Sequence, residues 1–91
     1  MKEITEETLN KYFDVTKRAL DKVNSNEIVD KKEAHDFLDM AQRYYKDANY
    51  FKEKGDYVRA FGALNYAHAW LDAGARLKWF KVNDSDLFAA D

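Results

Sequence analysis

Two histidines of the chain each precede an aspartate by four residues, a spacing that some metal sites use. His35 precedes Asp39 and His68 precedes Asp72, and residues four apart on a helix share a face, as ligands of one ion must. A four-ligand site within one subunit needs both pairs to converge. In the antiparallel hairpin derived below, the two histidines lie about five residues apart along the axis, or ~7 Å at the rise of a helix. We therefore expect two helix-surface pairs, with no metal and no cofactor.

A polar stripe on the last long apolar segment could bind or act on a small molecule. It places a candidate base, an acid and a fork-shaped cation on one side of a helix. The members of this stripe are Asn65, His68, Asp72 and Arg76. The ordinary interpretation is a stripe that faces water, with an Asp72–Arg76 ion pair worth about 0.2 to 0.5 kcal/mol. Because no nucleophile or glycine-rich phosphate loop accompanies it, we assign no catalytic residue and lean away from an enzyme. A small enzyme or ligand-binding domain stays the alternative function.

Composition argues against several other classes of protein. The formal net charge is −2, with lysines and acids interspersed, so no field of one sign attracts phosphate and we expect no nucleic-acid partner. The chain has no cysteine, which excludes disulfides and fits a reducing compartment, so we expect a cytoplasmic protein. No apolar run approaches the ~20 residues that cross a bilayer, and the first residues lack the apolar segment of a signal peptide, so we expect no membrane association.

The length and composition suit one folded domain. The chain has 91 residues, of which 46% are hydrophobic and 35% charged, as in ordinary globular proteins. No repeat or proline-rich linker divides it. We expect a single helical domain over residues 1–91, of all-α class, built as a three-helix bundle with a short C-terminal tail over residues 81–91.

Apolar residues at three- and four-residue steps predict three helices, at about residues 5–24, 30–54 and 57–80. Thr5 is expected to cap the first helix through its hydroxyl. Asp30 is expected to cap the second, with Glu33 reaching back to the Asp30 amide. Gly55 can end that helix in the left-handed conformation and Asp56 can cap the next one at once. The second and third helices should therefore form a tight antiparallel hairpin.

Small residues recur every seven positions on both helices of this hairpin. A register centred on the turn pairs Ala48 with Ala60, Ala41 with Ala67, and Ala34 with Gly74. The two helix axes should therefore approach to the usual ~8 to 10 Å or closer. Larger residues are expected to flank this seam on the side of the first helix, namely Phe37, Leu38, Tyr44, Tyr45, Leu64 and Leu71.

The third helix is apolar around more of its circumference than one neighbouring helix can cover. The surplus, which we take as a candidate interaction surface, consists of Tyr66, Trp70, Ala73 and Leu77. Exposed patches of this kind mark partner sites, so we expect a noncatalytic module for protein–protein interaction or self-association, with a homodimer as one form. The competing interpretation is that Trp79, Phe80 and the tail cover this side. Leu87 and Phe88 are expected to dock the tail onto the bundle.

The hairpin resembles a known family over the segment from Ala41 to Leu77, AQRYYKDANYFKEKGDYVRAFGALNYAHAWLDAGARL. This segment is similar to the archaeal domain-of-unknown-function family 357 (DUF357), and the apolar Leu87-Phe88 ending is similar to the short apolar terminus of that family. The resemblance implies a small helical bundle in the cytoplasm of an archaeal cell. It implies no activity and no functional residues, because none are assigned to the family.

Overall fold

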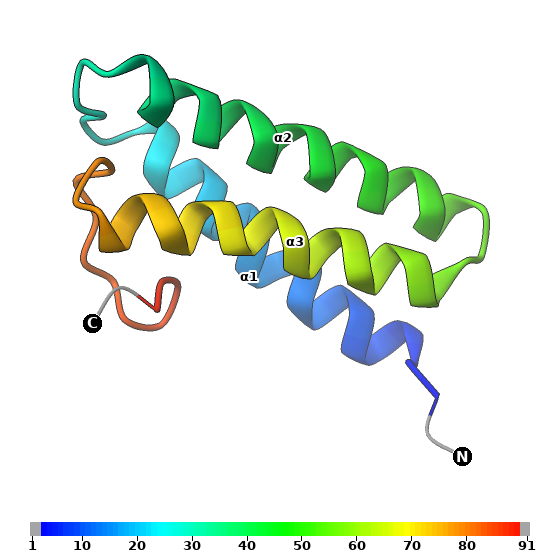
Figure 1. The fold of residues 1–91 in the computed structure, drawn as a ribbon. Helices are drawn as coiled ribbons and strands as arrows, with labels where there is room; N and C mark the ends of the chain where they lie inside the picture. Colours follow the sequence, from blue (N-terminus) through cyan, green and yellow to red (C-terminus); the bar gives the residue numbers. More distant parts are fainter. Residues whose placement is uncertain (1–2, 90–91) are drawn as a thin grey trace.

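The computed structural model describes residues 3–89 and contains three α-helices. They are α1 (Glu6–Asn24), α2 (Lys32–Glu53) and α3 (Tyr57–Arg76). Helices α2 and α3 lie side by side and antiparallel, while α1 crosses behind them (Figure 1). No strand occurs within residues 3–89. The predicted all-α three-helix bundle with its tight α2–α3 hairpin is confirmed.

Three of the predicted helix ends are confirmed, two by capping hydrogen bonds and one by the left-handed conformation of a glycine. The Thr5 hydroxyl oxygen accepts a hydrogen bond from the Thr8 amide at 3.1 Å, and the Asp56 carboxylate accepts one from the Arg59 amide at 3.1 Å. Gly55 has φ of 76° and so takes the left-handed conformation after α2. These ends depend on residues within three positions of one another, which is why they can be read from sequence.

The predicted start of α2 is wrong by two residues. The helix begins at Lys32, and its capping residue is Lys31, whose side chain makes no capping hydrogen bond. Asp30 lies outside the helix because the preceding residues pair with the chain that follows α3. The Val29 amide donates to the Trp79 carbonyl at 2.9 Å, beside an antiparallel bridge between Ile28 and Phe80.

The third helix ends at Arg76, four residues before the predicted end. Lys78 has φ of 61°, and the amides of Trp79 and Phe80 donate to the Gly74 carbonyl at 3.0 and 3.2 Å. This is the hydrogen-bond pattern of a helix ended by a left-handed residue, a position that usually carries glycine. Because lysine occupies it here, the sequence gives no local sign of the helix end.

The early end of α3 lets Phe80 turn back over Gly74. Phe80 is almost fully buried, with 1% of its surface exposed. A Cβ atom added to Gly74 would lie 2.1 Å from the Phe80 ring, so only glycine leaves room for this ring. The sequence predicts that Gly74 faces Ala34 across the seam; in the structure, the missing side chain of Gly74 makes room for the Phe80 ring.

The core lies between the three helices in two adjoining clusters. One cluster, near the α2–α3 turn, joins Leu9 and Phe13 to Ala48, Ala60 and Leu64. The other joins the end of α1 to the far end of the hairpin and to the tail; its buried members are Ala19, Leu20, Val23, Leu38, Ala41, Leu71, Ala75, Phe80, Leu87 and Phe88. The small residues of the hairpin seam are all buried: Ala34, Ala41, Ala48, Ala60, Ala67 and Gly74.

The predicted placement of two aromatic residues beside the seam is wrong. Phe37 packs edge-on against Trp70 at 4.9 Å between ring centroids, and Tyr44 packs against Tyr66 at 4.4 Å. Both contacts are with α3, whereas Tyr45, one position further on, contacts Phe13 of α1. One residue turns a helix by about 100°, so consecutive aromatic residues flank opposite sides of the seam.

Helix α1 is also tied to the start of α3 by a hydrogen bond. The Tyr57 hydroxyl donates to the Glu6 carboxylate at 2.9 Å. This hydrogen bond raises the pKa of Tyr57 above its ordinary value, with smaller contributions from burial and from the Glu6 charge. Both residues lie at helix N-termini, so α1 and α3 start at the same end of the bundle.

The tail docks on the bundle, as predicted. Asp84 starts a turn in which its carboxylate accepts from the Asp86 amide at 3.0 Å and its carbonyl accepts from the amides of Leu87 and Phe88 at 3.0 and 2.9 Å. This turn aims both apolar side chains into the core, where they are 5% and 4% exposed. The last two residues of the predicted tail, 90 and 91, lie outside the described residues.

Adding one methyl group to each of two glycines of α3 should have opposite effects on stability. Gly74→Ala should lower the free energy of unfolding by about 1 to 3 kcal/mol, because the buried Phe80 ring must move. Gly62→Ala, the matched control, should raise it by about 0.5 to 1 kcal/mol, because its Cβ meets no atom within 4 Å. Urea unfolding of both variants checks this; equal effects would contradict the assigned Phe80 contact.

Glycine at position 78 should stabilise the protein. Lys78→Gly relieves a left-handed conformation that costs a residue with a side chain about 1 to 2 kcal/mol, partly offset by the greater freedom of glycine in the unfolded chain. We expect a higher thermal midpoint, measured by circular dichroism. Lys81→Gly, three residues further on and outside the left-handed region, is the control and should not raise it.

Candidate functional site

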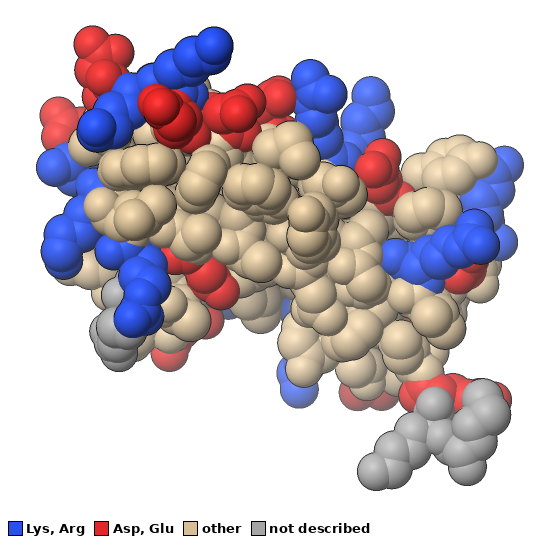
Figure 2. All heavy atoms as spheres, viewed as in Figure 1, with Lys and Arg blue, Asp and Glu red and all other residues tan. Residues whose placement is uncertain are grey.

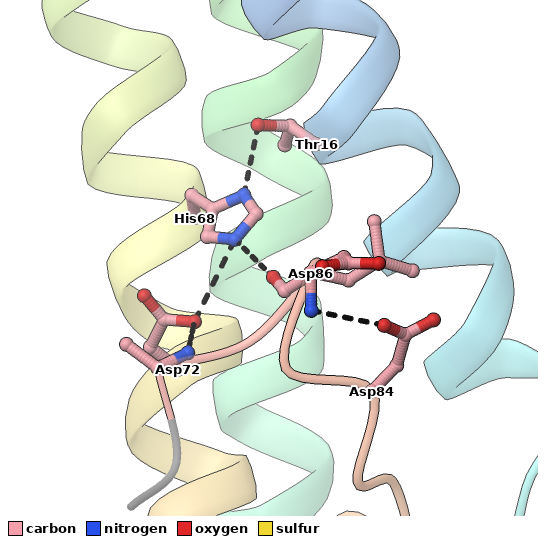
Figure 3. Close-up of polar contacts among 7 residues, drawn as sticks. Thr16, His68, Asp72, Asp84 and Asp86 are labelled. Carbon is pink, nitrogen blue, oxygen red and sulfur yellow. Dashed lines mark hydrogen bonds and ion pairs between the residues drawn. The ribbon is translucent and has the colours of Figure 1, made fainter.

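The predicted polar stripe of α3 contains a histidine that joins three parts of the chain (Figure 3). His68 Nδ1 lies 3.0 Å from the Thr16 hydroxyl of α1, and His68 Nε2 lies 2.6 Å from the Leu87 carbonyl oxygen of the tail. A carbonyl can only accept, so Nε2 carries the proton and donates it. When the ring carries this single proton, Nδ1 is the acceptor and the Thr16 hydroxyl donates to it.

Asp72 completes this arrangement from the next turn of α3. Its carboxylate accepts a hydrogen bond from the Ala89 amide at 3.0 Å and lies 3.6 Å from His68 Nε2. The side chains of His68 and Asp72 are 18% and 30% exposed. We call the group formed by Thr16, His68, Asp72 and the backbone of Leu87 and Ala89 the polar clasp, because its contacts hold the tail against α1 and α3.

The expectation that the whole stripe faces water is therefore wrong in its middle. Asn65 and Arg76 are exposed at its two ends, but His68 and Asp72 are half covered by α1 and the tail. The covering segments lie 52 and 19 residues away from His68 in sequence. The helical periodicity of α3 alone cannot reveal such cover, because it describes one helix and not its neighbours.

A shallow hollow of about 250 Å³ lies beside the polar clasp, between α1 and α3. It brings together three residues of the predicted stripe, Asn65, His68 and Asp72, but not Arg76. Both nitrogens of the His68 ring are already engaged within the chain. A general base needs a nitrogen within reach of a substrate proton, so His68 in this arrangement supports the tail and has no nitrogen available for catalysis.

The two histidine–aspartate pairs stay apart. Asp39 of the first pair forms an ion pair with Arg43 at 2.8 Å, and His35 is exposed on α2. Within residues 3–89, no three histidine, cysteine or acidic side chains come together as a metal site would require.

The predicted interaction surface on α3 is partly exposed. Tyr66 and Leu77 are 49% and 51% exposed, whereas Trp70 and Ala73 are half-buried. Trp70 is shielded by edge-on contacts with Phe37 and Tyr66, and its indole nitrogen is buried without a hydrogen-bond partner within residues 3–89. Trp70 therefore lies at the edge of this surface, and Tyr66 and Leu77 are its most exposed members.

A row of uncharged and mostly exposed residues runs along α3, and sequence reasoning found only part of it. Val58 is 73% exposed, and Gly62 and Ala69 are exposed as well. Their spacing of three and four residues could have found them, but small residues carry little hydropathy signal. We call this row the outer stripe of α3; its members are Val58, Gly62, Tyr66, Ala69, Ala73 and Leu77. Figure 2 shows an uncharged band over the face formed by α2 and α3, with charged residues mostly at its edges.

A family model described as "Protein of unknown function (DUF357)" matches residues 11–80. The chain belongs to the DUF357 family. The match covers most of α1 and all of α2 and α3, and thus the DUF357 region of this chain includes both the outer stripe and the α1 and α3 residues of the polar clasp. No curated protein and no solved structure matches the chain. Among the described residues, no helix combines the length and apolar character needed to span a membrane.

Removing the histidine of the polar clasp should loosen the tail of this DUF357 protein. His68→Ala leaves the Thr16 hydroxyl and the Leu87 carbonyl without their partner, which should lower the free energy of unfolding by about 1 to 3 kcal/mol. Amide hydrogen exchange of residues 87–89 should accelerate before that of α2. His35→Ala, at an exposed histidine of α2, is the control and should change neither quantity; equal effects of the two substitutions would contradict the clasp.

Proposed function

We propose that this protein is a noncatalytic helical module that binds another protein chain through the outer stripe of α3. The observation that carries the proposal is the exposure of Val58, Tyr66 and Leu77 on one face of a single helix. The opposite sides of α3 are already covered by α1, α2 and the tail, so the outer stripe contributes little to folding. Large exposed apolar residues that folding does not require are typical of protein-binding surfaces.

The surroundings of the outer stripe also suit protein binding. Tyr66 contacts Tyr44 and Trp70, and these ring contacts hold it in place before any partner arrives. Rigid aromatic residues lose little conformational entropy on binding and often dominate interface energetics. No position of the outer stripe carries a charge, so a partner can cover it without burying an unpaired ion.

A ligand-binding function at the hollow beside the polar clasp is the second candidate. Three residues of the polar stripe line the hollow, which favours ligand binding. However, both His68 nitrogens and an Asp72 oxygen are already hydrogen-bonded within the chain. We therefore rank it below protein binding. We also propose a cytoplasmic site of action in an archaeal cell, which fits a chain without cysteine.

Site-specific photocrosslinking tests the proposed function. Benzoylphenylalanine placed at position 66 should yield one discrete adduct in cells that make the chain at its native level. The same residue at position 50 is the control, because Tyr50 is similarly exposed, at 57%, but lies on α2. The position-66 adduct should disappear when Leu77→Glu is added, while that substitution changes the free energy of unfolding by no more than about 0.5 kcal/mol. Equal adducts from positions 66 and 50, or none from 66, would refute protein binding at this stripe.

A further inference from the structure

A second hollow lies between the end of α3 and the tail, and the proposed function does not use it. Its volume is about 410 Å³, within the ~300 to 1,000 Å³ of small-molecule sites. Residues after Arg76 form most of its lining, because the chain turns back there and the tail passes beside α3 (Figure 1). We call it the lysine hollow, because its charged lining residues are Lys78 and Lys81.

The polar side chains that line the lysine hollow have no partner within the described chain. Lys78 and Lys81 form no ion pair with any of residues 3–89. The side chains of Asn83 and Ser85, which line the hollow as well, form no hydrogen bond there. No aspartate or glutamate of the described part lines it. Two cations, an amide and a hydroxyl are therefore available to an anion, which is the partner that such donors prefer.

The backbone at Lys78 points independently to a role for its side chain. Its φ of 61° is the left-handed conformation, which glycine adopts without strain and lysine does not. Residues with side chains in such conformations are concentrated at functional sites. A cation also suits the C-terminal end of a helix, but Arg76 already supplies one in the last turn of α3. Lining the hollow thus gives a reason for a lysine at this strained position.

The rest of the lining is apolar and restricts the kind of anion that fits. Phe80 and Phe88 are 1% and 4% exposed, so they form a firm floor, and the half-buried Val82 adds a more accessible apolar side chain. An inorganic ion would pair with the lysines and leave this apolar lining in water. A neutral apolar molecule would cover the lining and desolvate the ammonium groups without a counter-charge. An anion with an apolar body satisfies both parts.

We propose that the lysine hollow binds a small phosphate monoester with an apolar body. A phosphate monoester carries close to two negative charges at pH 7 and several acceptor oxygens, which match two lysines with an amide and a hydroxyl beside them. A carboxylate supplies a single charge. The carboxylate of Asp84, the acid nearest in sequence, is held by the Asp86 amide. The lysine hollow shares no residue with the outer stripe, so binding there does not depend on the proposed protein-binding function.

Titration of the full chain with phenyl phosphate, followed by NMR of the backbone amides at constant ionic strength, tests the site. Saturable shifts should occur among residues 78–88, with a Kd of about 1 mM for a ligand of this size. Inorganic phosphate, benzyl alcohol and benzoate should each bind several times more weakly, because they lack the body, the head group and the second charge respectively. Equal affinity for any of the three would overturn the assigned ligand class, and no saturable shift in residues 78–88 would overturn the site.

Substitution of the lysines separates binding from folding. Lys78→Gly should raise the thermal midpoint, because it relieves the left-handed strain, yet it should weaken phenyl phosphate binding about fivefold by removing one cation. Lys81→Gln should weaken binding by a similar factor, whereas Lys78→Arg, which keeps the charge, should retain it. Lys46→Gln is the matched control, because it removes the same charge from an exposed position of α2. An equal loss in the control, or unchanged affinity in Lys78→Gly and Lys81→Gln, would overturn the proposal.

Discussion

The contact between the Phe80 ring and the bare backbone of Gly74 determines how one end of the bundle is built. The ring can reach this position only because α3 ends at Arg76 and the chain reverses through Lys78. The reversal brings residues 79–81 beside the loop between α1 and α2, where amides and carbonyls pair across the gap. A buried aromatic ring that needs a missing Cβ tolerates little variation at either position. This contact therefore fixes the end of α3 and, through the backbone pairing beyond it, the position of the α1–α2 loop, while the polar clasp holds the tail.

Different sides of α3 contact different parts of the protein, which explains why the helix is apolar on so many sides. Its small residues meet α2, and its Leu64 and Leu71 enter the clusters shared with α1. The polar side at His68 and Asp72 holds the tail. The outer stripe faces outward: five of its six residues are exposed, although Tyr66 also packs against Tyr44 of α2. An apolar excess in sequence therefore marks two different things here, internal packing and an exposed surface, while two members of the polar stripe, His68 and Asp72, hold the tail.

Features that depend on residues close together in sequence could be predicted from the sequence, and features that depend on distant segments could not. The caps at Thr5 and Asp56 and the turn at Gly55 use residues within one helical turn, and the small-residue seam follows from a seven-residue repeat. The errors all involve distant segments. Asp30 has a capping sequence, but it lies outside α2 because the residues before it pair with the chain after α3. Lys78 takes the left-handed conformation, which its residue type does not predict. His68 acquires its role from Thr16 and Leu87, neither of which is near it in sequence.

The buried position of Phe88 has a consequence for the order in which the protein folds during synthesis. The hairpin of α2 and α3 pairs residues that are close in sequence, so it can form as soon as α3 has left the ribosome. The larger core cluster, in contrast, contains Leu87 and Phe88 together with Ala19 and Leu20 of α1. That cluster stays open to water until residue 88 has emerged, and only then can the tail close over it. During this interval a chain with an already formed hairpin exposes the apolar surface that the tail covers in the finished fold.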